Sequence, residues 1–218
     1  RNGKGKKFVS DPMSKALELD RVGDFLNAEI EYKNVLKKSP RNTSALTNLG
    51  VIYLRKGDPK NSIPLFEKSL HFDAQQPLAV NNLGNANLEL NKPEEAISIF
   101  KKAILLDPNY FVAYNNLGKT LFMLRRFEEA LQYLDQAIGI NPNYARAHRN
   151  KGSVLQENRQ YEQAISSYTK AFEIEPAYPF LLGNLVHLQQ HICQWKNLAE
   201  FFPLLLKKVD QGYSCIYP

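Results

Sequence analysis

The sequence predicts an all-α fold in which helix pairs stack as a right-handed superhelix, an α-solenoid of about five to six pairs. The first observation is a pattern that returns at a constant step of 34, as Asn48-Leu49-Gly50, Asn82-Leu83-Gly84 and Asn116-Leu117-Gly118, and more loosely from Asn150 and Asn184. The second is that two further series keep the same step: Pro40, Ala74, Pro108, Pro142 and Pro176, and Ala28, Ser62, Ala96, Ala130 and Ala164. Independent series that share one period indicate an internal repeat.

A period of 34 built on small and aromatic positions is the signature of the tetratricopeptide repeat, so the sequence resembles that family. One helix–turn–helix unit cannot bury its apolar face alone, and stacking of units supplies the core. Clustered positive charge and glycine predict a disordered basic tail at 1–8, and the period predicts five repeats followed by a degenerate sixth helix pair at 179–218. The five repeats are 9–42, 43–76, 77–110, 111–144 and 145–178.

Helix boundaries in the first repeat follow from caps and breakers. Asp11 caps a helix that opens at Pro12, the turn at Gly23-Asp24 follows, and Pro40 stops the second helix. These signals predict a helix pair that begins about three residues into the repeat.

The second repeat contains one irregular residue. Gly57-Asp58-Pro59 supplies in turn a bend, a cap and a proline at the first helical position. Pro64 then falls inside the second helix, where it removes a backbone donor and crowds a carbonyl. We therefore expect a local distortion or a late helix start at Pro64.

The third and fourth repeats each open their second helix with two glutamates, Glu94-Glu95 and Glu128-Glu129. Paired carboxylates can serve as a catalytic acid and base, but negative charge in a first turn also complements the helix dipole. The dipole explanation is favoured because the pair recurs with the repeat. Beyond 178 the pattern decays, and we expect one helix over 179–192 and another over 195–208.

Small residues are expected where the two helices of a pair cross closely. Gly50, Gly84, Gly118 and Gly152 occupy one position in the first helices, and the alanine series occupies another in the second helices. The large side chains Phe66, Phe100, Leu134 and Tyr168 are expected to fill the space between neighbouring repeats. The aromatic series is therefore predicted to be core rather than a cofactor site.

The first helices should line the concave face, where a ligand would bind. Positions one before and three after the recurring asparagine share its helical face. They give a candidate peptide-binding groove of Asn48, Asn81, Asn82, Asn85, Asn115, Asn116, Lys119, Arg149, Asn150 and Asn184. Asparagine is a poor helix former, and its amide carries donors and an acceptor that match a peptide backbone. The alternative is that these asparagines bond to neighbouring helices and help to stack the repeats.

Composition disfavours several partners and compartments. The net charge is +6, but the basic residues of 1–8 supply +4, which leaves 6 − 4 = +2 and argues against nucleic acid. No run of about 18 apolar residues occurs, so we expect no membrane span, and the first residues show no signal-peptide pattern. Cys193 and Cys215 form no disulfide framework, which is typical of a reducing, cytoplasmic compartment.

No sequence motif indicates catalysis, a cofactor or a metal. There is no P-loop, no Gly-x-Gly-x-x-Gly after a strand, no nucleophile elbow and no zinc-type cysteine pairing. His187, His191 and Cys193 lie close in sequence, but no acidic partner or second cysteine accompanies them. The chain is therefore predicted to be non-catalytic.

The stretch from His187 onward reads His-Leu-Gln-Gln-His-Ile-Cys-Gln-Trp, followed by an apolar helix and, near the end, Tyr217-Pro218. It resembles the junction between the repeats and the catalytic half of O-linked N-acetylglucosamine transferases, glycosyltransferase family 41. Ile192-Cys193 and Trp195 match that family's stretch, while Gln194 replaces its aspartate. The recurring asparagines also resemble that family's groove.

This resemblance implies that the chain recruits protein substrates for a UDP-sugar-dependent glycosyltransferase whose catalytic domains follow Pro218. The alternative is a stand-alone adaptor for protein complexes. Adaptors that clamp carboxylate tails usually carry Lys and Arg beside the asparagine position, and only Lys119, Arg146 and Arg149 do so here. The helix over 195–208 should also expose an apolar side that promotes self-association, through Phe201, Phe202, Leu204 and Leu205.

Overall fold

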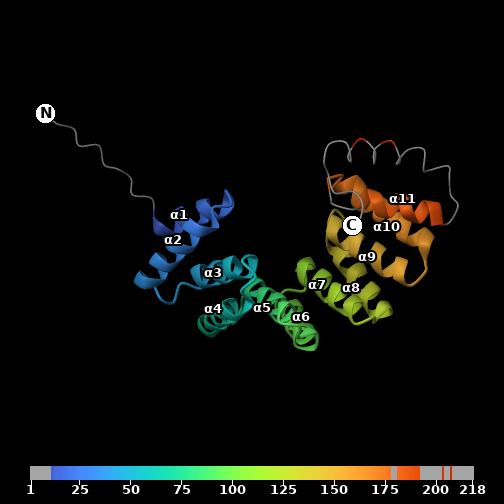
Figure 1. Ribbon diagram of the computed structural model, residues 1–218. Coiled ribbons are helices and arrows are strands. Elements are labelled where there is room, and N and C mark those ends of the chain that lie inside the picture. Colours follow the sequence, from blue (N-terminus) through green and yellow to red (C-terminus); the bar gives the residue numbers. More distant parts are fainter. Residues whose placement is uncertain (1–10, 178–180, 192–202, 204–206, 208–218) are drawn as a thin grey trace. The chain divides into compact units, whose positions relative to one another are not determined.

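A computed structural model describes residues 11–177 and 181–191, together with Pro203 and Lys207. In these residues it forms eleven α-helices and no strand, so the all-α prediction is confirmed (Figure 1). The helices are α1 (Pro12–Arg21), α2 (Phe25–Lys38), α3 (Thr43–Arg55), α4 (Pro59–Phe72), α5 (Pro77–Glu89), α6 (Pro93–Leu106), α7 (Phe111–Met123), α8 (Phe127–Ile140), α9 (Ala145–Glu157), α10 (Tyr161–Ile174) and α11 (Leu181–His191).

The helices repeat with the period of the sequence. α3, α5, α7 and α9 begin at 43, 77, 111 and 145, and α2, α4, α6, α8 and α10 begin at 25, 59, 93, 127 and 161. From α4 onward, each of these helices therefore begins one full repeat period after its counterpart in the preceding repeat, whereas α3 begins 43 − 12 = 31 residues after α1. The predicted tail at 1–8, the junction after 191 and the apolar helix over 195–208 lie outside the described residues, apart from Pro203 and Lys207.

Helices pack in pairs, α1 with α2 and so on to α9 with α10, and most pairs then pack against the next helix. The chain divides into two compact units, Arg1–Leu106 and Asp107–Pro218. The N-terminal unit contains α1 to α6, and the C-terminal unit contains α7 to α11. In each unit the first helices of adjacent pairs also touch, α3 with α5 and α7 with α9.

Glycine permits the close crossing within a pair, as the sequence predicts. A Cβ added at Gly50 would lie 2.6 Å from the Phe66 ring, and one at Gly152 would lie 2.7 Å from the Tyr168 ring. Gly84 faces Phe100 at 2.5 Å and Gly118 faces Leu134 at 2.7 Å in the same way. The large side chain therefore lies against the glycine of its own pair, rather than only between neighbouring repeats.

Aspartate side chains cap the N-termini of α1 and α4. Asp11 accepts a hydrogen bond from the Ser14 backbone N–H, and Asp58 accepts one from Asn61. Both caps confirm the predicted helix starts, with proline at the first helical position.

The late start expected at Pro64 is wrong, because α4 begins at Pro59 and continues through Pro64 to Phe72. Proline at this position removes only the hydrogen bond to the Lys60 carbonyl, four residues earlier. Lys60 and Pro64 are both exposed, so water can reach the carbonyl that loses its partner. An exposed site in the first turns of a helix therefore tolerates the proline.

Candidate functional site

The position before the recurring asparagine is buried in the second, third and fourth repeats. Asn81 and Asn115 retain only 2% and 3% of their accessible surface, and Thr47 at the same register is equally buried. The Thr47 Oγ1 lies 2.9 Å from the Ser69 Oγ, which joins α3 to α4. The side chains of Thr47, Asn81 and Asn115 are therefore largely shielded from solvent.

Four side chains of the C-terminal unit form a chain of hydrogen bonds between α7 and α9, the first helices of two adjacent repeats. The Asn150 Nδ2 donates to the Asn115 Oδ1 at 2.8 Å, which joins α9 to α7. The Asn115 Nδ2 donates to the Asn116 Oδ1 at 3.3 Å, and an Arg149 guanidinium nitrogen donates to the Asn150 Oδ1 at 2.7 Å. Asn150 is 7% exposed, so this bond is largely shielded from water. Asn115 and Asn150 therefore stack the repeats, as the alternative explanation for the asparagines supposes.

The other candidate residues retain accessible surface. Asn48, Asn82, Asn116 and Asn184, at the recurring position, are half-buried. Asn85 and Arg149 are also half-buried, and Lys119 is exposed. The ten candidates thus separate into a buried group of Asn81, Asn115 and Asn150, and a partly accessible group that a ligand can reach.

A polar hollow of about 320 Å³ opens on the C-terminal unit. Four helices contribute to it: α7, α9, α10 and α11. The side chains that line it are Phe122, Ser153, Gln156, Glu157, Tyr168 and Asn184. Asn184 is a predicted site residue, so the hollow adjoins one end of the predicted groove.

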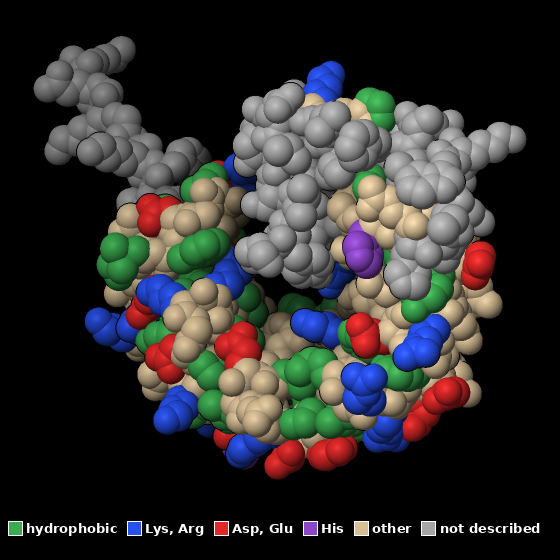
Figure 2. All heavy atoms as spheres, turned by 45° about the vertical axis from the view of Figure 1, so that its right-hand side comes forward, with side chains coloured by type: hydrophobic (Ala, Val, Ile, Leu, Met, Phe, Trp, Pro, Cys, Tyr) green, Lys and Arg blue, Asp and Glu red, His purple; other side chains and the backbone are tan. Residues whose placement is uncertain are grey.

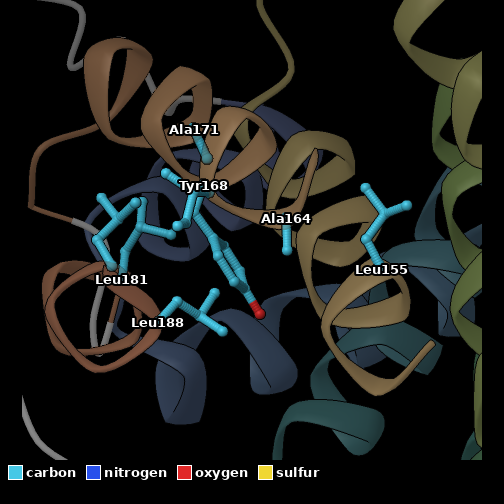
Figure 3. Packing of buried hydrophobic residues seen from close by; sticks show 8 residues of the cluster. Leu155, Ala164, Tyr168, Ala171, Leu181 and Leu188 are labelled. Carbon is cyan, nitrogen blue, oxygen red and sulfur yellow. The ribbon is translucent and has the colours of Figure 1, made fainter. Parts of the chain in front are cut away.

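The Tyr168 hydroxyl provides the fixed polar group of this hollow. It lies 3.0 Å from the Gln156 Oε1 and 3.1 Å from the Ser153 Oγ, to which it can donate. The Tyr168 ring is held in a cluster with Leu181 and Leu188 of α11 and with Ala164, and its oxygen lies at the end of the ring away from Ala171 (Figure 3). The Ser153 hydroxyl in turn donates to the Arg149 carbonyl at 3.2 Å. The apolar cluster around the Tyr168 ring therefore holds its hydroxyl in place beside Ser153 and Gln156.

The equivalent tyrosine of the first repeat has a different environment. Tyr32 is fully buried, and burial raises the pKa of its hydroxyl, with the negative charge of Asp20 acting in the same direction. The Asn48 side chain lies beside the hydroxyl and acts against this shift. Asp20 is itself paired with Arg55 at 2.6 Å. In this part of the N-terminal unit, Asp20 and Arg55 already pair with each other, so their charges are less available to a ligand.

A second hollow of about 440 Å³ lies among α8, α9 and α10. Two lysines line it, but Lys151 pairs with Asp135 at 2.6 Å and Lys170 pairs with Glu173 at 3.0 Å. Because these cations already have carboxylate partners, an added anion would have to compete with them. This hollow is the weaker candidate.

Sequence reasoning did not select Phe122, Gln156, Glu157 or Tyr168 as site residues. Tyr168 was assigned to the core, which is where its ring lies, but its hydroxyl reaches the hollow. A signal was present, because Tyr168 stands where the second and third repeats carry Phe66 and Phe100. A hydroxyl added at a core position indicates a nearby polar partner.

The remaining chemical predictions are only partly tested by the described residues. Glu94 and Glu95 lie in the first turn of α6, and Glu128 and Glu129 lie in that of α8, as predicted from the dipole. Among the described residues, no cluster of three or more metal-ligand side chains occurs, and no helix is long and apolar enough to cross a membrane. The side chain of His191 and all of Cys193 lie outside the described residues.

Charge on the surface is mixed. Lys and Arg side chains alternate with Asp and Glu over the face shown in Figure 2, without a single basic patch. The fold defines a helical-repeat protein, and its described surface carries charges of both signs.

Three family models described as tetratricopeptide repeat match residues 13–77, 87–152 and 145–178. Together they cover more than half of the 218 residues. The chain therefore belongs to the tetratricopeptide-repeat family. No curated protein matches the sequence.

Solved structures of other repeat proteins are similar to this one. PilW, described as a widely conserved type IV pilus biogenesis factor, gives a TM-score of 0.81 at 21% identity over 91% of this chain and 92% of that chain. MamA gives 0.62 at 29% identity over 74% and 94%. YrrB, described as a TPR protein with an unusual peptide-binding site, gives 0.60 at 23% identity over 82% and 90%. These likenesses support the α-solenoid fold.

Proposed function

We propose that the C-terminal unit binds an extended segment of a partner protein along the face formed by α7, α9 and α11. The observation that carries the proposal is the polar hollow, which the polar side chains Ser153, Tyr168 and Asn184 line together. Hollows that bind ligands combine an apolar wall with a few fixed polar groups, and here the Phe122 ring supplies the wall.

The partly accessible asparagines extend this surface. Asn116 and Asn184 carry amides that can pair with the N–H and C=O groups of an extended backbone. Such contacts are neutral hydrogen bonds, so each contributes about 0.5–1.5 kcal/mol and depends little on the partner's side chains. The family assignment supports a non-catalytic scaffold, and YrrB provides a precedent for a peptide site on this fold.

The test uses the full chain and peptides selected from a random library, with affinity measured by fluorescence anisotropy. Asn184→Ala and Ser153→Ala should each weaken binding by about threefold to tenfold, because each removes one hydrogen-bonding group from the hollow. Ser166→Ala, at the second hollow, is the matched control and should leave affinity unchanged. Equal affinity in all three variants, or stronger loss from Ser166→Ala, would place binding elsewhere and refute the proposal.

The narrower function, recruitment of substrates for a family 41 glycosyltransferase, remains a prediction of the sequence resemblance. Most of the stretch that carries it, from 192 onward, lies outside the described residues, and the comparisons with known proteins add no support. Its test is the reading frame beyond Pro218. About 300 further residues with alternating strand and helix patterns would favour the transferase, and a short polar end would favour the stand-alone adaptor.

A further inference from the structure

The polar hollow has an excess of negative character. Glu157 is the one ionisable carboxylate among the described residues that line it, and these include no Lys, Arg or His. Among the described residues, no ion pair of Glu157 is found. A carboxylate without a cationic partner beside a polar hollow favours a positively charged ligand group.

Two helix ends strengthen this preference. Phe122 is the penultimate residue of α7, and Gln156 and Glu157 are the last two residues of α9. The C-terminal end of a helix carries partial negative charge, which favours cations, although the backbone N–H groups of Arg125 and Arg159 already donate to the Phe122 and Gln156 carbonyls at these two ends. Neither α7 nor α9 has a basic residue in its last turn to offset that charge.

The basic residues near these helix ends are engaged elsewhere. Arg125 lies over the Phe127 ring at 5.2 Å, and Arg126 pairs with Glu129 at 2.7 Å. Arg149 donates to Asn150. Arg159, two residues beyond Glu157, does not line the hollow. The hollow therefore has room for a cation from outside the described chain.

The remaining lining groups match a planar guanidinium. Phe122 lines the hollow and supplies an aromatic ring that a guanidinium can contact, with the Glu157 carboxylate as a charged acceptor. The Gln156 and Asn184 side-chain carbonyls add neutral acceptors. A lysine ammonium could use the carboxylate but would gain less from the ring, because it presents a point charge.

We infer that this hollow is a subsite for an arginine side chain of the bound segment. The inference rests on the proposed function, since it specifies a residue that the bound segment carries. The subsite would give the binding face a preference for arginine in the bound segment, whereas the asparagines would contact only the backbone of that segment.

The direct test titrates the full chain with N-acetyl-arginine amide and follows amide resonances of Ser153, Gln156 and Glu157 by NMR. N-acetyl-citrulline amide is the matched probe, because it keeps the planar shape and removes the charge. We expect the arginine probe to bind about fivefold or more tightly than the citrulline probe, since a charge-assisted bond is stronger than a neutral one.

Glu157→Gln should abolish the preference for arginine over citrulline while leaving the melting temperature unchanged, because Glu157 is exposed at a helix end. Glu162→Gln, an exposed residue in the first turn of α10, is the control and should preserve the preference. Equal binding of the two probes, or a preference that survives Glu157→Gln, would overturn the inference.

A second arm separates this inference from the proposed function. Peptide libraries with arginine, citrulline or glutamate fixed at one position are presented to the full chain. Peptide binding without an arginine preference removes the subsite and leaves the peptide-binding function intact. Binding of N-acetyl-arginine amide at the hollow, without capture of any peptide, keeps the subsite and removes the peptide-binding function.

Discussion

The first and last described helix triples, α1–α3 and α9–α11, carry equivalent residues on a shared frame. Their positions differ by four repeat periods. Tyr32 corresponds to Tyr168 and Asn48 corresponds to Asn184, so both triples keep a buried tyrosine and the recurring asparagine. Three neighbouring positions differ: Leu17, Asp20 and Arg21 in the first triple are Ser153, Gln156 and Glu157 in the last.

These three positions decide what each triple presents to a ligand. In the first, Asp20 pairs with Arg55 and Arg21 pairs with Glu18 at 2.7 Å, while Leu17 is apolar and 46% exposed. In the last, the serine and glutamine bond to the Tyr168 hydroxyl and line an open hollow. The core residues of the repeat build the helix pairs, and a few side chains on the first helix determine whether a site forms.

The largest expected effect comes from filling the glycine contact beneath that site. Gly152→Leu forces a side chain into the Tyr168 ring, which a Cβ alone would approach to 2.7 Å, and should destabilise the C-terminal unit by about 1–3 kcal/mol. Thermal unfolding measures the loss. Gly139→Leu in α8 is the control, because nothing lies within 4 Å of a Cβ there, and it should be neutral or stabilising. Equal melting of both variants would contradict the packing.

A somewhat smaller loss is expected from Asn150→Ala. The change leaves the buried Asn115 amide without its 2.8 Å partner, and an unpaired buried polar group costs about 1–3 kcal/mol, partly offset by the better helix propensity of alanine. Chemical denaturation gives the difference. Asn184→Ala, at a half-buried site, should change stability by less than about 0.5 kcal/mol. If Asn184→Ala is the more damaging variant, the division between stacking and accessible asparagines is wrong.

The helix pairs could be predicted from the sequence because period, caps and breakers are local signals. Asp58-Pro59 predicts a helix start by itself, and the close approach of the two helices of a pair follows from the step that the glycine and alanine series share. The expected late helix start at Pro64 is wrong because the free-energy cost of an internal proline depends on whether the carbonyl that loses its hydrogen bond is exposed to water. Exposure is a property of the folded repeat rather than of the local sequence.

The site was harder to predict because it depends on contacts between repeats. Asn115 and Asn150 lie 35 residues apart and bond directly, which a single-repeat pattern cannot distinguish from a shared ligand face. The hollow combines side chains from four helices, and its carboxylate, Glu157, lies two turns from the asparagine used to define the groove. A face defined by periodicity therefore identified the helices but only part of the site.

The equivalent tyrosines of the two triples, Tyr32 and Tyr168, should differ by a smaller amount in their contribution to stability. Tyr168→Phe removes hydrogen bonds to Ser153 and Gln156, and should reduce stability by about 0.5–1.5 kcal/mol. Among the described residues, none gives the Tyr32 hydroxyl a hydrogen bond of normal geometry, although Asn48 lies beside it. Tyr32→Phe should therefore be close to neutral in the same unfolding measurement. A larger loss from Tyr32→Phe would reverse the proposed difference between the two triples.

The smallest effect should distinguish the paired carboxylate of the first triple from the unpaired carboxylate of the last. Hydrogen bonds from Lys33 and Lys56 lower the pKa of Glu29 from 4.5 to about 2, and the Tyr53 hydroxyl donates to the same carboxylate at 3.2 Å. Because the folded pKa is depressed, its stabilisation is present above pH 4.5 and is lost as the pH falls toward 2.

Glu29→Gln should therefore lower the free energy of unfolding at neutral pH by less than about 1 kcal/mol, since ion pairs near the surface are screened by solvent and salt. The deficit should shrink below pH 4.5 and nearly vanish near pH 2, which denaturant titrations at a series of pH values can follow. Among the described residues Glu157 has no ion pair, so Glu157→Gln should change the free energy of unfolding at neutral pH less than Glu29→Gln does. A deficit of Glu29→Gln that persists unchanged at pH 2 would mean that the side chain stabilises the α2–α3 contact through packing rather than through its charge.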